Sequence, residues 1–191
     1  MLTRRLTLFL PLLAAACASR RQPAEPPPGP ISYTHLTRLP LNVATVEIAP
    51  EGPPPIGAGQ EASPSPAEAV RIMGRDRLEA VGSTGRAVFT VTTASLLRDR
   101  ARLTCLLGCR LEILSPQGAR LGFIEAQASR VVTGPEAERP RAADLVLRRT
   151  MDDLNVEFEF QLRRNLKDWL VTAGPVPGGV GEVTQEELPK P

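Results

Sequence analysis

The stretch "ARLTCLLGCRLEIL", residues 101–114, decides the fold that we predict for this chain. Every odd position in it is apolar: Ala101, Leu103, Cys105, Leu107, Cys109, Leu111 and Ile113. Successive side chains of a β-strand point to opposite faces of the sheet, so this alternation predicts a strand with one buried face. The segments on either side indicate which elements pair with this strand and which cover its buried face.

Three further segments have the length and composition of strands. "GRAVFTVTTASLL" (85–97) precedes the central strand, and "GARLGFIEAQASRVV" (118–132) follows it after a turn at 116–118. "LPLNVATVEIA" (39–49) is an apolar run rich in β-branched residues and predicts another strand. Segment 118–132 has one face of small or apolar residues, namely Gly122, Ile124, Ala126 and Ala128. We expect a helix to pack closely on that face.

A first helix is predicted within "SPSPAEAVRIMGRDRLEAVG" (63–82). Ser65 suits the N-cap, Pro66 the first helical position and Glu68 the third, which together form a capping box. Gly82 suits the position just after the helix. The face that we expect to pack inward consists of Val70, Met73, Arg77 and Val81, with Ile72 and Ala80 beside it.

A second helix is predicted over 142–170 from one continuous apolar stripe. The stripe contains Leu147, Met151, Leu154, Phe158, Leu162, Leu166 and Trp169. On the polar face, oppositely charged residues stand four apart: Arg148 and Asp152, Arg149 and Asp153, Glu159 and Arg163, Arg164 and Asp168. The fold that follows is α+β, an antiparallel sheet of about four strands with two helices packed on one face, in the order βαβββα over residues 31–171.

The N-terminus has the pattern of an export signal. Arg4 and Arg5 precede an apolar run over 6–16, and small residues follow, so we interpret residues 1–16 as a signal peptide. Eleven residues rise only about 16 Å as a helix, too little for a bilayer core of about 30 Å. The run ends in "LLAAACAS" (12–19), which places Cys17 directly after three alanines.

This end of the signal resembles a bacterial lipobox, although Leu13 stands one position early. The resemblance implies that Cys17 is the lipidation site and becomes the acylated N-terminus, which anchors the protein to a membrane. Ordinary cleavage near Ala18, which would give a soluble periplasmic protein, is the alternative. Residues 17–30 then form the lipidated cysteine and a Pro-rich tether, and 172–191 a disordered tail.

The charge balance argues against nucleic acid as a partner. Removing residues 1–16 takes Arg4 and Arg5 from the 23 basic residues and leaves 21, against 21 acidic residues. Nucleic-acid binding requires clustered positive charge, and the sequence has no such cluster.

Cys105 and Cys109 offer two interpretations. On one strand their Cα atoms would stand about 13 Å apart, beyond the reach of a disulfide of about 7 Å. A hairpin turning at Gly108 would bring them together, but the unbroken apolar alternation argues against it. We therefore expect buried free thiols. His35 is the only histidine, so neither a metal site nor a catalytic triad is predicted.

The remaining motifs carry no chemistry that we can assign. "GAGQEA" (57–62) matches a dinucleotide-binding pattern, but it does not join a strand directly to a helix, so we interpret it as a loop. "GSTG" (82–85) is interpreted as a helix end and turn. Asp152, Asp153 and Glu157 are interpreted as a solvated face among arginines. We predict no catalytic, cofactor-binding or metal site, and a protein that is not an enzyme.

The chain as a whole resembles a known type of envelope protein. Its Cys17 and Pro-rich tether, with "LPLNVATVEI", "SPAEAVRIMGRDRLEAVG", "RLEIL…GARLGFIEAQASR" and "MDDLNVEFEFQLRRNL", look like uncharacterised bacterial envelope lipoproteins. Over residues 31–170 they also distantly resemble the ABC-type transport auxiliary lipoprotein family.

The resemblance implies a non-catalytic accessory subunit of an envelope lipid-transport complex. Such a subunit would be lipid-anchored, would face the periplasm at the outer membrane rather than the inner, and would bind an envelope protein partner. The alternative is a tethered activator or scaffold for cell-wall synthesis or outer-membrane assembly.

Overall fold

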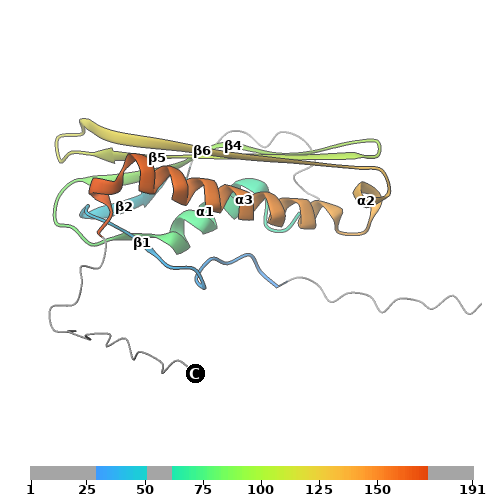
Figure 1. The fold of residues 1–191 in the computed structure, drawn as a ribbon, viewed down its shortest axis with the longest axis horizontal. Helices are drawn as coiled ribbons and strands as arrows, with labels where there is room; N and C mark the ends of the chain where they lie inside the picture. Colours follow the sequence, from blue (N-terminus) through green and yellow to red (C-terminus); the bar gives the residue numbers. More distant parts are fainter. Residues whose placement is uncertain (1–28, 51–61, 172–191) are drawn as a thin grey trace, which may run out of the picture.

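The computed structural model describes residues 29–50 and 62–171 and has the predicted α+β architecture. Two helices, α1 (Pro66–Arg77) and α3 (Ala142–Asn165), lie on one face of a four-stranded sheet (Figure 1). The sheet has the order β2-β4-β5-β6, with β2 at Thr45–Ile48, β4 at Arg86–Asp99, β5 at Arg102–Leu114 and β6 at Arg120–Thr133.

Several smaller elements accompany the four-stranded sheet and the two helices. Strands β1 (Leu39–Leu41) and β3 (Leu78–Ala80) pair in parallel as a separate two-stranded sheet. The short helix α2 (Pro135–Glu138) leads from β6 to α3, and a 3-10 helix, Lys167–Trp169, follows α3. Leu170 then forms an antiparallel bridge with Leu41, which ties the end of the described chain to β1.

β5 is an inner strand of the sheet, and its apolar face is buried, as the alternation predicts. β5 pairs antiparallel with β4 on one side and β6 on the other, with Cys109 opposite Val91 and Ala126. All its odd positions from Leu103 to Ile113 are buried, and Ala101 at its start is half-buried. Because β5 runs unbroken through 106–108, the hairpin that would join Cys105 to Cys109 is excluded; both are buried free cysteines.

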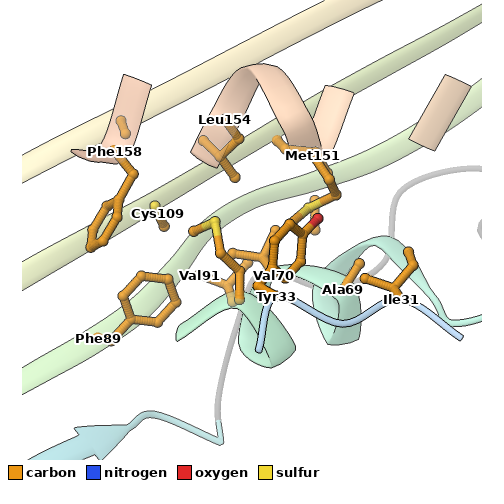
Figure 2. Close-up of a cluster of buried hydrophobic side chains, with 14 of the residues drawn as sticks. Ile31, Tyr33, Ala69, Val70, Phe89, Val91, Cys109, Met151, Leu154 and Phe158 are labelled. Atoms are coloured by element: carbon orange, nitrogen blue, oxygen red, sulfur yellow. The ribbon is translucent and has the colours of Figure 1, made fainter. Parts of the chain in front are cut away.

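The stripe of α3 packs on β5 and β6. The stripe residues from Leu147 to Leu166 are buried. Among them, Phe158 packs edge to face on Phe89 of β4, with the ring centroids 5.6 Å apart (Figure 2). The small residues of β6 allow this approach, since a Cβ atom at Gly122 would lie 2.7 Å from Leu166 Cδ2. The close helix packing predicted for this strand is confirmed.

The predicted strand 39–49 is wrong in one respect, because it is two strands in two sheets. Val43 N–H donates to Leu41 O at 2.8 Å, a tight three-residue turn that separates β1 from β2. β2 then pairs with β4 in parallel, Val46 opposite Ala87, whereas a wholly antiparallel sheet was expected. The central strands β4, β5 and β6 are antiparallel.

The first helix begins as predicted and ends earlier. Ser65 caps it by accepting a hydrogen bond from Glu68 N, but Leu78 is already extended and starts β3. The predicted helix end at Gly82 is therefore wrong, and Val81 is exposed. Gly82 is required for another reason: a Cβ atom there would lie 2.6 Å from the backbone of Asn42 and Val43. Residues 78–80 leave the helix because they pair with β1.

The polar face of α3 pairs with other elements more than with itself. Of the predicted pairs, Glu159–Arg163 forms an ion pair at 2.8 Å. Asp153 instead pairs with Arg130 of β6 at 2.6 Å, and Arg148 donates to Gly29 O at 2.5 Å. Neighbouring layers therefore supply partners that helical spacing alone does not reveal.

Arg77 is the buried polar link between the two helices. Its guanidinium donates to Thr37 O at 3.1 Å, to Asn155 Oδ1 at 2.5 Å and to Glu159 Oε2 at 2.5 Å. Its side chain is only 1% exposed, so these hydrogen bonds replace the water that it loses on folding. Three segments, the one before β1 together with α1 and α3, thus meet at one charged group.

We predict that Phe158→Ala destabilises the protein strongly. Phe158 is fully buried, and removing a buried aromatic ring costs about 3–5 kcal/mol of a total of about 5–15. The melting temperature by circular dichroism should fall sharply. The matched control is Val156→Ala on the exposed face of the same helix, 69% exposed, which should change it little. Equal melting temperatures for the two variants would contradict the packing described here.

We predict acid-sensitive stability that depends on Glu159. Burial alone would raise the pKa of Glu159, but hydrogen bonds and charges from Arg77 and Arg163 outweigh it and lower that pKa. A carboxylate with a depressed folded-state pKa stabilises the fold above its unfolded pKa, near 4.5, and this contribution is lost as pH falls through the lower folded value. Denaturant titrations at several pH values should show this loss in the wild type and a smaller one in Glu159→Gln.

Candidate functional site

The described elements leave the face of the sheet opposite the helices uncovered (Figure 1). We call it the open face; it consists of the outward side chains of β4, β5 and β6. Five large apolar residues of these strands are exposed, between 37% and 52%: Leu97, Leu106, Leu121, Phe123 and Val131. The register places Leu97, Leu106, Phe123 and Val131 on the side of the sheet that the α1 and α3 helices do not contact, and Leu121 lies at the irregularity near the start of β6.

One end of the open face is apolar. Thr104 lies between Leu97 and Val131 in one cross-strand row, and Leu106 lies between Ser95 and Ser129 in the next row. Side chains opposite each other on paired strands are about 4.5–5.5 Å apart at Cβ, so Leu97, Leu106 and Val131 form one patch. Such a patch with a polar surround is typical of a protein-binding surface.

The other end of the open face is charged around one aromatic ring. Arg110 Nε donates to Glu125 Oε1 at 2.8 Å, and Arg120 pairs with Glu112 at 3.4 Å. Both guanidinium groups lie over Phe123, at 5.9 Å and 4.9 Å from the ring centroid. The hydrogen bond and charge of Glu125 raise the pKa of Arg110, so Arg110 keeps its charge.

Gly108 lies between the two ends of the open face, and its lack of a side chain lets residues of the neighbouring strands pack closely against it. A Cβ atom there would lie 2.8 Å from Thr92 Oγ1 and 3.3 Å from Gln127 Cγ. Thr92 sits at the irregularity in the pairing of β4 with β5, between Val91 and Thr93. The middle of the open face is therefore polar and tightly packed. The apolar end and the charged end are the parts of this face that a partner would contact.

The segment before β1 lies on the far side of the helices from the open face (Figure 1). Ile31 and Tyr33 are buried against α1 and α3 (Figure 2), and Tyr33 N–H donates to Asp76 Oδ2 at 2.7 Å. With the bond from Arg148 to Gly29 O, these contacts fix where the chain enters the fold. If the protein is attached through the residues before Gly29, the attachment is therefore on the helix side of the domain.

A shallow pocket of about 220 Å³ lies beside this segment. His35 and Arg148 line it together with Tyr33 and Asp152, and the His35 ring stacks on Tyr33 with centroids 6.5 Å apart. Burial, and then the Asp152 carboxylate, raise the pKa of Tyr33 above its usual value, so its hydroxyl stays protonated. Because Arg148 is already bound to the backbone of Gly29, the pocket offers less for a ligand than the open face.

The acidic residues considered in the sequence do not converge. Asp152 and Asp153 are exposed, and Asp153 is bound to Arg130. Glu157 accepts a hydrogen bond from Gln161 Nε2 at 2.7 Å on its own helix. These positions agree with a solvated face whose charges are paired locally or with β6.

The two described cysteines are chemically protected. Burial raises the pKa of Cys105 to about 11, against a smaller lowering by Thr150, and that of Cys109 to about 12. A thiolate is the reactive form of cysteine, so these thiols are unreactive at neutral pH. They serve as small apolar residues of the central strand, as we expected.

Several predicted features fall outside the described residues. Cys17, the signal peptide, the tether before Gly29 and the tail 172–191 lie there, and so does 57–61 of the glycine-rich motif. The 82–85 motif is described and forms the turn into β4, where Gly85 has a positive φ of 72° and Ala44 N–H donates to Gly85 O at 3.1 Å.

Across 29–50 and 62–171, no group of three or more His, Cys, Asp or Glu side chains is placed to bind a metal ion. In the same part of the chain, no helix combines the length and apolarity that crossing a bilayer requires.

Comparison with known proteins assigns no family. No protein-family model matches the sequence, and no curated protein is similar enough to match it. A minor lipoprotein from Acinetobacter baumannii shares 17% identity over 71% of this chain and all of its own, with a TM-score of 0.37. A provisionally assigned lipoprotein from Caulobacter crescentus CB15 shares 15% identity over 61% of this chain and 85% of its own, with a TM-score of 0.34. Similarities this weak establish neither the fold family nor the function.

Proposed function

We propose that this chain is a non-enzymatic lipoprotein of the bacterial cell envelope that acts by binding another envelope protein. In this proposal Cys17 carries the lipid, and the folded domain faces the periplasm at the outer membrane. The support for the anchor is the sequence at 12–19, where a charged and then apolar signal ends in small residues and a cysteine.

The observation that carries the binding role is the placement of the open face. It lies on the other side of the molecule from Ile31 and Tyr33, by which the chain enters the fold. A protein tethered through that segment would turn its helix side toward the anchor and leave Leu97, Leu106 and Val131 available to a partner. Interfaces of this kind combine an apolar centre with polar groups at the rim.

Within this role, we favour an accessory subunit of an envelope lipid-transport complex. The chain's resemblance to auxiliary transport lipoproteins supports it, and so does an exposed apolar surface that could dock on a ring or barrel. A tethered activator or scaffold for cell-wall synthesis or outer-membrane assembly is the second candidate. It would use the same anchor and the same open face, and the identity of the copurified partner distinguishes the two.

We predict that the mature protein carries lipid on Cys17. Intact mass spectrometry of the protein from its native membrane should give the mass of a chain beginning at Cys17 with diacylglycerol and an acyl group. The Cys17→Ala variant should lose that modification and its membrane association, whereas Cys105→Ala should keep both. An unmodified N-terminus at Ala18 or Ser19 in the wild type would contradict the lipid anchor.

We predict that the apolar end of the open face holds the partner. Leu97→Lys combined with Leu106→Lys places two charges on the patch and should lower the affinity for the copurified envelope protein at least about tenfold. Both residues are well exposed, so the melting temperature should be nearly unchanged. The control is Val81→Lys, 48% exposed and outside the open face, which should keep the partner. Unchanged copurification of the double variant would contradict this docking surface.

A further inference from the structure

The β6 strand is a long edge of the main sheet. β6 has 14 residues and stands at the end of the order β2-β4-β5-β6, whereas β2 at the other end has four. Among the described residues, β5 is its only strand partner. A long edge strand presents a row of backbone N–H and C=O groups that can pair with another chain.

We propose that two copies of this chain pair antiparallel along β6, about a two-fold axis at Gln127, to form a continuous eight-stranded sheet. In an antiparallel pair, residues opposite each other share one face of the sheet. Placing Gln127 opposite itself puts Phe123 of one copy opposite Val131 of the second copy, and the symmetry repeats this contact. This inference does not depend on the lipid anchor or on the partner proposed above.

The open-face side chains of β6 are complementary to themselves in this register. Phe123 and Val131 are 46% and 49% exposed and stand four residues on either side of Gln127. Each would cover the other, and pairs of an aromatic with a β-branched residue stabilise neighbouring strands. Glu125 would face Ser129, so no two like charges stand opposite each other. A symmetric interface of this kind requires one patch that fits itself.

The α3 helix supplies a second observation, because its exposed Phe160 lies on the side of the helix nearest to the same edge. Asn155 and Glu159 point toward α1 through Arg77, whereas Asp153 reaches Arg130 on β6. Positions 153, 156, 160 and 164 lie along one side of the helix. Of these, Phe160, 52% exposed, is the closer to Asp153 around the helix, whereas Val156, 69% exposed, points away from the sheet.

The same two-fold axis brings the two α3 helices side by side and antiparallel. The contacts Asp153–Arg130 and Leu166–Gly122 place the part of the helix around Phe158 over the middle of β6. Phe160 would then be covered by the second copy. Arg164, which lies 5.8 Å from the Phe160 ring centroid, would approach Asp153 of the second copy. One axis therefore covers Phe123 and Val131 of β6 and Phe160 of α3.

The first test is the mass of the full mature chain by native mass spectrometry over a range of concentrations. The wild type should be a dimer, and a wild type that stays monomeric would overturn the proposal. Phe123→Lys with Val131→Lys places like charges opposite each other and should raise the dimer dissociation constant at least about tenfold. Phe123→Lys with Val131→Glu places opposite charges there and should restore the dimer.

The control for folding is Leu97→Lys, which is equally exposed on the same face but lies on β4, two strands from the edge. It should leave the dimer intact. Dissociation by Leu97→Lys, or failure of the opposite-charge pair to recover dimers while its melting temperature is normal, would overturn pairing through β6.

The second test fixes the register by oxidative crosslinking. Gln127→Cys lies on the axis and should form a disulfide-linked dimer. Ser129→Cys should not, because its two copies would stand about 13 Å apart along the strands, beyond a disulfide. Cys105 and Cys109 are buried and do not interfere. A crosslink at Ser129→Cys and none at Gln127→Cys would overturn this register.

Discussion

The structure depends on the contact between the apolar stripe of α3 and the helix side of β5 and β6. β5 can bury its odd positions only if a second layer covers them, and among the described elements α3 has the long apolar stripe that does so. The contact is close because β6 presents the small residues Gly122 and Ala126 on either side of Ile124. Burial of the stripe also decides which side of the sheet remains open, since the described chain has its other long helix, α1, in the same layer.

Arg77 adds specificity to this otherwise apolar layer. A buried guanidinium is unfavourable unless each hydrogen bond that it loses to water is replaced, and here Thr37, Asn155 and Glu159 replace them. The observed placement of α1 against α3 satisfies all three. The sequence pattern already put Arg77 on the inward face of the first helix, where a charge at an apolar position indicates a buried polar partner rather than a surface residue.

The sequence predicts the elements whose periodicity is strong and local. The strand at 101–114, the helix stripe from Leu147 to Leu166 and the capping box at Ser65 all depend on neighbours within one element, and all are present. The division of 39–49 and the early end of α1 depend on pairing between β1 and β3, whose paired residues are 39 positions apart in the sequence. The parallel pairing of β2 with β4 likewise joins distant segments, and no local pattern specifies which distant strand a given strand will pair with.

The open face was missed for a related reason. Its apolar residues, Leu106 on β5 and Phe123 and Val131 on β6, occupy positions that alternation assigns to solvent. That exception was the available signal, because a strand with large apolar residues on both faces indicates a second contact. On α3, Phe160 breaks the polar face in the same way. These exceptions lie on two adjoining surfaces, the open face and the β6 edge, while the chain enters the fold on a third. The domain therefore has room for a partner on the sheet and a second copy at its edge without competition from the segment that leads to the anchor.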